Sequence, residues 1–200
     1  MSTLEWLLLG VGVVTAGLNL TVIGLSILGL SSWYPLEAKN WQFYTFWGTE
    51  QVHNLALLGL GYLQFGVLGL PQWATLLGGG LFVGGFVIVI VATFDLGVDQ
   101  TQGLKGALRT DGLYRYSRNP QYVGYIPATV GFALIVDSPF VAPLCGLLVV
   151  RWLILPLAEE PWLREQFGAE YEAYVDRVPR FVGLRTVGLV WELVGEGILD

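Results

Sequence analysis

Charge is scarce in this chain of 200 residues: only 13% of the residues are charged, and there are two lysines, one histidine and one cysteine. With a hydrophobic fraction of 54%, this composition excludes an ordinary soluble domain and favours an integral membrane protein. The lone Cys145 excludes an internal disulfide, and the lone His53 excludes a haem held by two histidines. We interpret His53, at the edge of an apolar run, as a hydrogen-bonding residue near the membrane interface. No metal site and no nucleic-acid partner are predicted.

Long apolar runs predict an all-α integral membrane protein with about five transmembrane helices in one domain, residues 1–200. The first run alone, 25 residues, is long enough to cross ~30 Å of hydrocarbon. The aromatic-rich connector 31–50 is typical of the headgroup level. Only Asp137, Ser138 and Pro139 separate the last two runs, which predicts a tight antiparallel hairpin. The predicted spans are residues 6–30, 52–70, 73–94, 120–136 and 140–157.

Two glycine clusters lie within the third span, at residues 78–80 and 84–85. A nucleotide-binding glycine loop needs a strand before it and a helix after it, and neither fits inside an apolar run. We therefore expect these glycines to serve helix packing or the close approach of a ligand to bare backbone.

After the fifth span the sequence becomes amphipathic. Apolar residues recur at intervals of three or four, which places them on one face of a helix. This pattern predicts an amphipathic helix on the cytoplasmic membrane surface, where it could also cover a site. The residues of this face are Leu163, Phe167, Tyr171, Tyr174 and Val178.

The bases predict the orientation of the chain in the cell membrane. Nine of the ten lysines and arginines fall in the connectors 31–50 and 95–119 or after residue 158, and the tenth is Arg151. Because basic loops stay in the cytoplasm, we expect these three regions inside and the N-terminus outside.

Two polar stretches interrupt the apolar pattern, and both fall on the predicted cytoplasmic side. The first, residues 112–124, reads Gly-Leu-Tyr-Arg-Tyr-Ser-Arg-Asn-Pro-Gln-Tyr-Val-Gly. The second begins with Glu159-Glu160-Pro161-Trp162-Leu163 and ends with Val178-Pro179-Arg180-Phe181. In order and spacing, residues 112–181 resemble membrane methyltransferases of the isoprenylcysteine carboxyl methyltransferase and phospholipid N-methyltransferase kind. Asn119 stands where many members have histidine.

This resemblance implies S-adenosylmethionine as cofactor and assigns residues to it. Arg118, with Arg115, would hold the cofactor's carboxylate, and Glu159 or Glu160 would accept from its ammonium or ribose hydroxyls. The other expected cofactor-binding residues are Asn119, Pro120 at a helix start, Tyr122 packing on adenine, and Gly124 allowing close approach. Membrane anchoring through lipid phosphates is the alternative for Arg115 and Arg118.

Arg151 lies inside the fifth predicted span, where a charge costs ~2.5–3.5 kcal/mol on insertion scales and so requires a partner or a cavity. Two roles remain open for it. It could pair with Glu159, two helical turns away, or it could orient an anionic methyl acceptor as a catalytic residue.

The predicted function is methyl transfer from S-adenosylmethionine to a lipophilic acceptor resembling an isoprenylcysteine carboxylate, with lipophilic or prenylated substrates and membrane lipids as partners. Transfer to a phospholipid amine is one alternative. An NADPH-dependent enzyme similar to sterol reductases and a non-enzymatic membrane module are two others.

Overall fold

The computed structural model describes residues 1–183 and 186, and these residues form helices and loops with no strand. The helices are α1 (Thr3–Ile27), α2 (Trp41–Leu63), α3 (Gln72–Leu96), α4 (Val98–Thr101), α5 (Pro120–Val136) and α6 (Val141–Arg177), with a 3-10 turn, η1 (Gly112–Arg115). The all-α prediction is confirmed. Residues 184–185 and 187–200 lie outside the described part of the chain.

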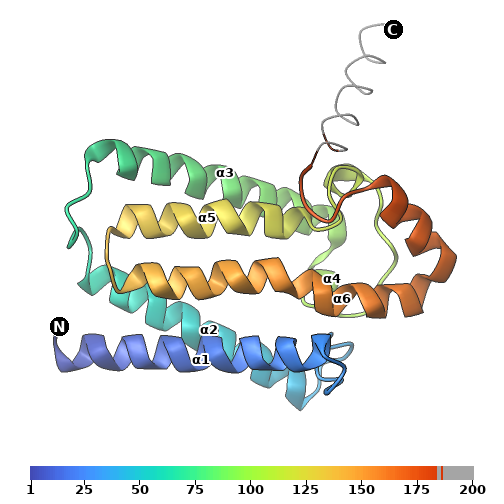
Figure 1. Cartoon of the computed structure of the whole chain (residues 1–200), viewed down its shortest axis with the longest axis horizontal. Coiled ribbons are helices and arrows are strands. Elements are labelled where there is room, and N and C mark those ends of the chain that lie inside the picture. Colours follow the sequence, from blue (N-terminus) through green and yellow to red (C-terminus); the bar gives the residue numbers. More distant parts are fainter. Residues whose placement is uncertain (184–185, 187–200) are drawn as a thin grey trace, which may run out of the picture.

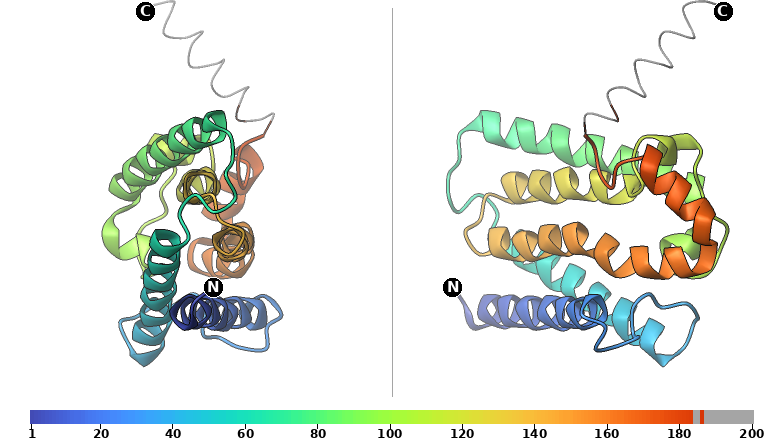
Figure 2. Two further views of the ribbon diagram at one scale, coloured as in Figure 1. Left: turned by 90° about the vertical axis from the view of Figure 1, so that its left-hand side faces the viewer. Right: turned by 45° about the vertical axis from the view of Figure 1, so that its right-hand side comes forward.

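The five long helices run side by side with α5 and α6 in the middle, α3 covering α5, and α1 and α2 on the other side (Figures 1 and 2). Three of them, α1, α3 and α6, are long and apolar enough to cross a membrane. The 17 residues of α5 are also apolar, and α2 carries more polar side chains than α1, α3 or α5. A count of five membrane crossings therefore remains a prediction.

The predicted second span was wrong in its bounds, because α2 begins at Trp41 rather than at residue 52 and ends at Leu63. The side chain of Asn40 accepts a hydrogen bond from the Phe43 backbone and so caps the helix inside the aromatic connector. Phe43 and Phe46 then pack in the core with Ile23 and Leu155. These rings are helix-packing residues rather than parts of a headgroup-level loop.

The α5–α6 hairpin is confirmed, and α5 has the predicted bounds. Asp137 adopts a left-handed conformation (φ 57°) at the turn, and its carboxylate accepts a hydrogen bond from the Leu70 backbone at 2.9 Å. Further backbone bonds join Gly66 to Val136 and Leu68 to Asp137. The loop between α2 and α3 is thereby tied to the hairpin at the end of the bundle opposite the polar stretches.

The predicted last span, residues 140–157, corresponds to the first part of α6, and the helix continues through both glutamates to Arg177. Each glutamate has hydrogen-bonded partners, so the helix continues without burying a free charge. Gly168, with φ 50° and ψ −125°, is the one non-helical residue within α6. There the helix bends, and its last turns fold back toward the start of α5 (Figure 1).

Two of the five glycines in these clusters, Gly78 and Gly85, serve helix packing, which is one of the two roles expected from the sequence. A Cβ on Gly78 would lie 2.8 Å from the carbonyl oxygen of Gly131, and one on Gly85 would lie 2.5 Å from that of Gly124. The backbones of α3 and α5 therefore approach each other at two places where only glycine fits.

Candidate functional site

The two polar stretches meet at one end of the bundle, joined by backbone and side-chain hydrogen bonds. The backbone nitrogen of Arg118 donates to the carbonyl oxygen of Pro179 at 2.9 Å. The side chains of Asn119 and Ser117 both donate to the carbonyl oxygen of Arg180, at 3.0 and 3.2 Å. Residues about sixty positions apart in the chain thus form one structural unit.

Glu160 lies at the centre of this unit and is 4% exposed. Arg180 donates to it through Nε and Nη2 at 2.6 and 2.8 Å, and Arg118 Nη1 lies 3.1 Å from its Oε1. A third arginine, Arg164, lies 3.7 Å from its Oε2. The hydrogen bonds from Arg180 to this carboxylate raise the pKa of Arg180. Glu160 therefore clamps the two stretches together.

Glu159 has a different environment, since its Oε1 accepts hydrogen bonds from two tyrosine hydroxyls. Tyr34 donates at 2.6 Å and Tyr122 at 2.7 Å. Burial and the neighbouring carboxylate raise the pKa of Tyr34 well above its ordinary value, so its hydroxyl stays protonated and remains a donor. Sequence reasoning missed Tyr34, which lies 125 residues before Glu159 in the aromatic connector.

A polar cavity of about 120 Å³ opens beside these groups. Five predicted cofactor-binding residues line it: Arg118, Asn119, Tyr122, Glu159 and Glu160. The apolar face of the last part of α6 forms one wall, through Trp162, Leu163, Phe167, Tyr171 and Tyr174. Tyr171, Tyr174 and Val178 form a buried cluster with Leu163 and Phe167 packed against it, so the amphipathic pattern covers a cavity.

Three predicted cofactor-binding residues do not line this cavity. Arg115 is exposed at the end of η1. Pro120 is the buried first residue of α5, and Gly124 is packed against Gly85. Arg109, which no sequence motif singled out, does line the cavity, and within the described residues it forms no ion pair.

A second, larger cavity of about 440 Å³ runs between α2, α3, α5 and α6. It shares Thr101, Gln121 and Tyr122 with the polar cavity, so the two adjoin. From Tyr122 to Phe132, which both line it, α5 advances about 15 Å at 1.5 Å per residue. Most of its wall is apolar and aromatic, including Leu57, Phe82, Phe86, Tyr125 and Trp152.

Arg151 lines this larger cavity and is 3% exposed. Its partner is Glu50 on α2, which accepts a charge-assisted hydrogen bond from Arg151 Nη1, so the pairing with Glu159 that the sequence left open was wrong. The guanidinium also lies over the rings of Phe46 and Trp152, 5.2 and 4.7 Å from their centroids. Trp152 in turn stacks on Tyr122, which lines the polar cavity. The Trp152 ring therefore connects Arg151 to a residue of that cavity.

His53 is fully buried, and its Nδ1 lies 2.9 Å from the carbonyl oxygen of Gly12 on α1. The expectation of a hydrogen-bonding residue is confirmed, with the partner on the neighbouring helix α1. Over residues 1–183 and 186 no group of histidine, cysteine and carboxylate side chains is placed to hold a metal ion.

Comparison with known proteins agrees with this geometry. Residues 73–170 match the family model described as phospholipid methyltransferase. The match covers 98 of the 200 residues. The matched segment includes nearly all of α3, the hairpin, both glutamates and the first polar stretch, so most residues that line the polar cavity lie within it.

Two curated relatives carry a more specific name. The chain is 33% identical over 73 residues to protein-S-isoprenylcysteine O-methyltransferase B of Arabidopsis thaliana, an alignment that covers 36% of this chain and 37% of the relative. It is 36% identical over 80 residues to protein-S-isoprenylcysteine O-methyltransferase of Schizosaccharomyces pombe, covering 38% of this chain and 33% of the relative. The match thus spans about a third of each relative's length. No solved structure matches this chain.

Proposed function

We propose that this protein is a membrane-embedded, S-adenosylmethionine-dependent methyltransferase whose acceptor is a lipophilic carboxylate of the isoprenylcysteine kind. One observation carries the proposal: a polar cavity built from both family stretches adjoins an apolar cavity through Thr101, Gln121 and Tyr122. A reaction between a polar donor and a lipophilic acceptor needs two such compartments in contact.

The residues of the polar cavity fit the cofactor. Arg118 uses Nη1 for Glu160, while its buried Nε has no hydrogen-bond partner among the described residues. The indole Nε1 of Trp162 is likewise buried without a partner. Buried donors without partners are costly, and a bound carboxylate or ribose oxygen would satisfy them. Arg118 would hold the cofactor's carboxylate, and Glu159 keeps lone pairs free for a hydroxyl or ammonium donor.

S-adenosylmethionine would supply an activated methyl group on a positively charged sulfur. A carboxylate acceptor would take this methyl group without a base, because its oxygen already carries a free lone pair and no proton has to be removed. The protein contributes chiefly by positioning the two reactants. In bimolecular reactions the cost of bringing the reactants together is a large part of the activation barrier, and positioning removes that cost. Arg151, lining the apolar cavity next to Trp152, is the group proposed to orient the acceptor's carboxylate.

Methyl transfer to a phospholipid amine is the second candidate, favoured by the description of the matched family. An amine acceptor must lose a proton, and Glu50 is the carboxylate that lines the apolar cavity. That carboxylate is already engaged by Arg151, which favours the carboxylate acceptor. The family match and both named relatives favour methyl transfer over the NADPH-dependent alternative.

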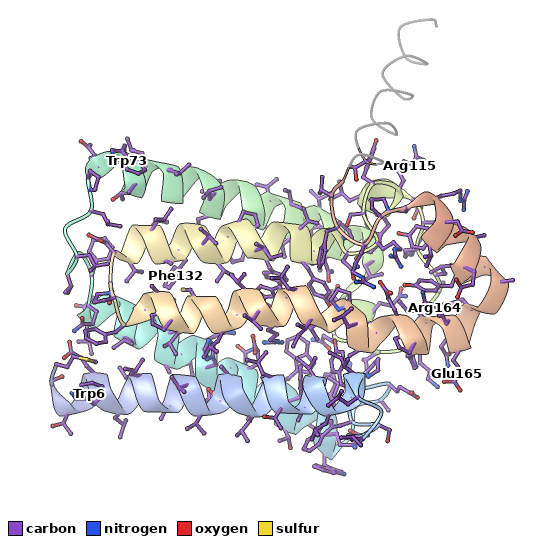
Figure 3. The ribbon with its side chains drawn as sticks, in the orientation of Figure 1. Trp6, Trp73, Arg115, Phe132, Arg164 and Glu165 are labelled. Carbon is purple, nitrogen blue, oxygen red and sulfur yellow. The ribbon has the colours of Figure 1, made fainter. Side chains whose placement is uncertain are left out.

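We infer the orientation of the protein in the membrane from the distribution of its lysines and arginines. Arg115 and Arg164 lie at the end of the bundle that carries the polar cavity, while Trp6 and Trp73 lie at the opposite end (Figure 3). Lys39 and Lys105 bind Asp99 and Glu37 in the connectors at the basic end. Since basic loops stay inside, we place this end in the cytoplasm of a cell membrane.

The decisive experiment gives the purified protein labelled S-adenosylmethionine with one of two acceptors: N-acetyl-S-prenylcysteine, or a phosphatidylethanolamine in vesicles. We expect label in a base-labile methyl ester of the first acceptor. Label in the phospholipid headgroup would instead select the second candidate. Binding of NADPH but not of S-adenosylhomocysteine would overturn both.

A further inference from the structure

Glu50 is a buried carboxylate in the wall of the apolar cavity, and no sequence motif pointed to it. It is 4% exposed and lies on α2, outside the family-matched segment. Besides Arg151, its Oε2 accepts a hydrogen bond from the Asn19 side chain of α1 at 3.2 Å. The side-chain oxygen Oδ1 of Asn19 in turn accepts a hydrogen bond from the Thr49 hydroxyl at 2.7 Å. Three helices, α1, α2 and α6, thus meet in one buried polar network.

This network leaves one edge of Arg151 unused. Glu50 engages Nη1, and within the described residues no hydrogen bond reaches Nε or Nη2. A guanidinium presents Nε and Nη2 as a planar fork that matches the two oxygens of a carboxylate. Glu50 and Asn19 therefore orient Arg151 from one side, and the Nε and Nη2 donors on the other side form no hydrogen bond with the described residues.

Charge balance gives Glu50 a second role. The Arg151–Glu50 pair carries no net charge, so an acceptor carboxylate entering the apolar cavity adds an uncompensated negative charge, which is costly at low dielectric. The positive sulfur of the methyl donor, in the adjoining cavity, offsets that charge. After transfer both the ester and the thioether are neutral, and the pair is balanced again.

We propose that Glu50 is a positioning residue that orients Arg151 and makes binding of the acceptor's carboxylate depend on a positively charged methyl donor in the adjoining cavity. This inference rests on the proposed function. Without Glu50, the positive charge of Arg151 would itself attract an anionic acceptor, whether or not the donor is charged.

The test measures acceptor binding to the full-length protein in lipid nanodiscs, saturated with either of two donor analogues. Sinefungin carries a positively charged amine near the position of the sulfonium, whereas S-adenosylhomocysteine is neutral there. The acceptor probes are N-acetyl-S-prenylcysteine and its primary amide, which has the same tail without the charge. We expect the acid to bind about tenfold tighter with sinefungin, a difference of ~1.4 kcal/mol. The amide should bind equally well with both.

Two variants then assign the effect to Glu50. The Glu50→Gln variant should bind the acid equally well with both analogues. Compared with the unmodified protein, its affinity for the acid should rise when S-adenosylhomocysteine is bound. Asn19→Ala keeps the charge of Glu50 but removes one of its hydrogen bonds, so it should weaken binding of the acid about threefold or more and leave the amide unchanged.

Equal affinity of the acid with both analogues in the unmodified protein would overturn the inference, as would a preference that survives in Glu50→Gln. If Glu50→Gln does not fold, Asn19→Ala decides, and equal effects on acid and amide would refute the positioning role. Failure of both donor analogues to bind would refute the proposed function itself, so the two failures are distinguishable.

Discussion

Arginine–glutamate pairs occur at both cavities, and they share a geometry at the residue scale. Arg118 and Arg151 each use Nη1 for a buried glutamate, and in each the Nε is buried without a partner in the described part of the chain. In both cases a tryptophan with an unpaired indole nitrogen, Trp162 or Trp152, lines the same cavity. The glutamates orient the arginines, and the unused donors are available to ligands.

Arg118→Ala should weaken binding of S-adenosylhomocysteine by about 1.5–3 kcal/mol, the range for a hydrogen bond to a charged group. Glu160 would keep Arg180 and Arg164, so the unit should still fold. Titration calorimetry on the purified variant measures the change. Arg115→Ala is the matched control, because Arg115 is exposed and does not line the cavity. Equal losses of affinity in the two variants would contradict a specific role of Arg118 and favour lipid anchoring for both arginines.

Arg151→Lys keeps the positive charge beside Glu50 but loses the planar fork. We expect turnover to fall on the order of tenfold to a hundredfold, because misplacing a reactant by about 1 Å has effects of that size. Affinity for S-adenosylhomocysteine should stay unchanged, since Arg151 does not line the polar cavity. Methyl-transfer kinetics and calorimetry on the same preparation check both statements, and normal turnover would leave Arg151 as a structural partner of Glu50.

At the scale of elements, the contact of α3 with α5 positions the first polar stretch. The carbonyl oxygens of Gly85 and Gly124 would each lie 2.5–2.6 Å from a Cβ on the opposite glycine. Since α5 begins at Pro120, directly after the polar stretch, the depth of this contact determines where Arg118 and Asn119 lie relative to α6.

Gly85→Ala should therefore separate the two helices and destabilise the protein by about 1–3 kcal/mol, the usual cost of overpacking. Thermal unfolding in detergent, followed by circular dichroism, measures the loss. The neighbouring Gly84→Ala is the control, because a Cβ there meets no atom within 4 Å. If both variants melt at the same temperature as the unmodified protein, the close contact does not contribute to stability.

At the scale of the whole molecule, the bundle has two different ends. One end carries the basic connectors and the polar cavity, and the other carries the N-terminus and the loop tied to Asp137 (Figure 1). Because one face of the membrane attracts basic segments, this asymmetry predicts a single orientation.

Reporter fusions test that orientation. A reporter at the N-terminus should be active outside the cell, and one inserted in the connector between α4 and η1 should be active in the cytoplasm. An internal N-terminus together with an internal connector would mean that the helices from α1 to α3 cross the membrane an even number of times, for example because α2 does not cross it.

The sequence alone determined the class and the outline of the protein, because both follow from local properties. Run length and hydropathy predicted helices near their observed positions, and the three-residue turn predicted the α5–α6 hairpin. The spacing of the polar stretches predicted a similarity to membrane methyltransferases, which the family match supports, and singled out five residues that line the polar cavity. Helix ends were less accurate where a cap such as Asn40, or satisfied charges such as Glu159 and Glu160, extended a helix past its apolar run.

Only the tertiary structure decided which groups pair. Tyr34 reaches Glu159 across 125 residues, and Glu50 reaches Arg151 across 101. Helical periodicity placed Arg151 and Glu159 on one face, yet a guanidinium pairs with the carboxylate that the neighbouring helix brings against it. That choice depends on how the faces of α1, α2 and α6 meet, which is settled by packing between helices and is not encoded in the spacing along any one of them.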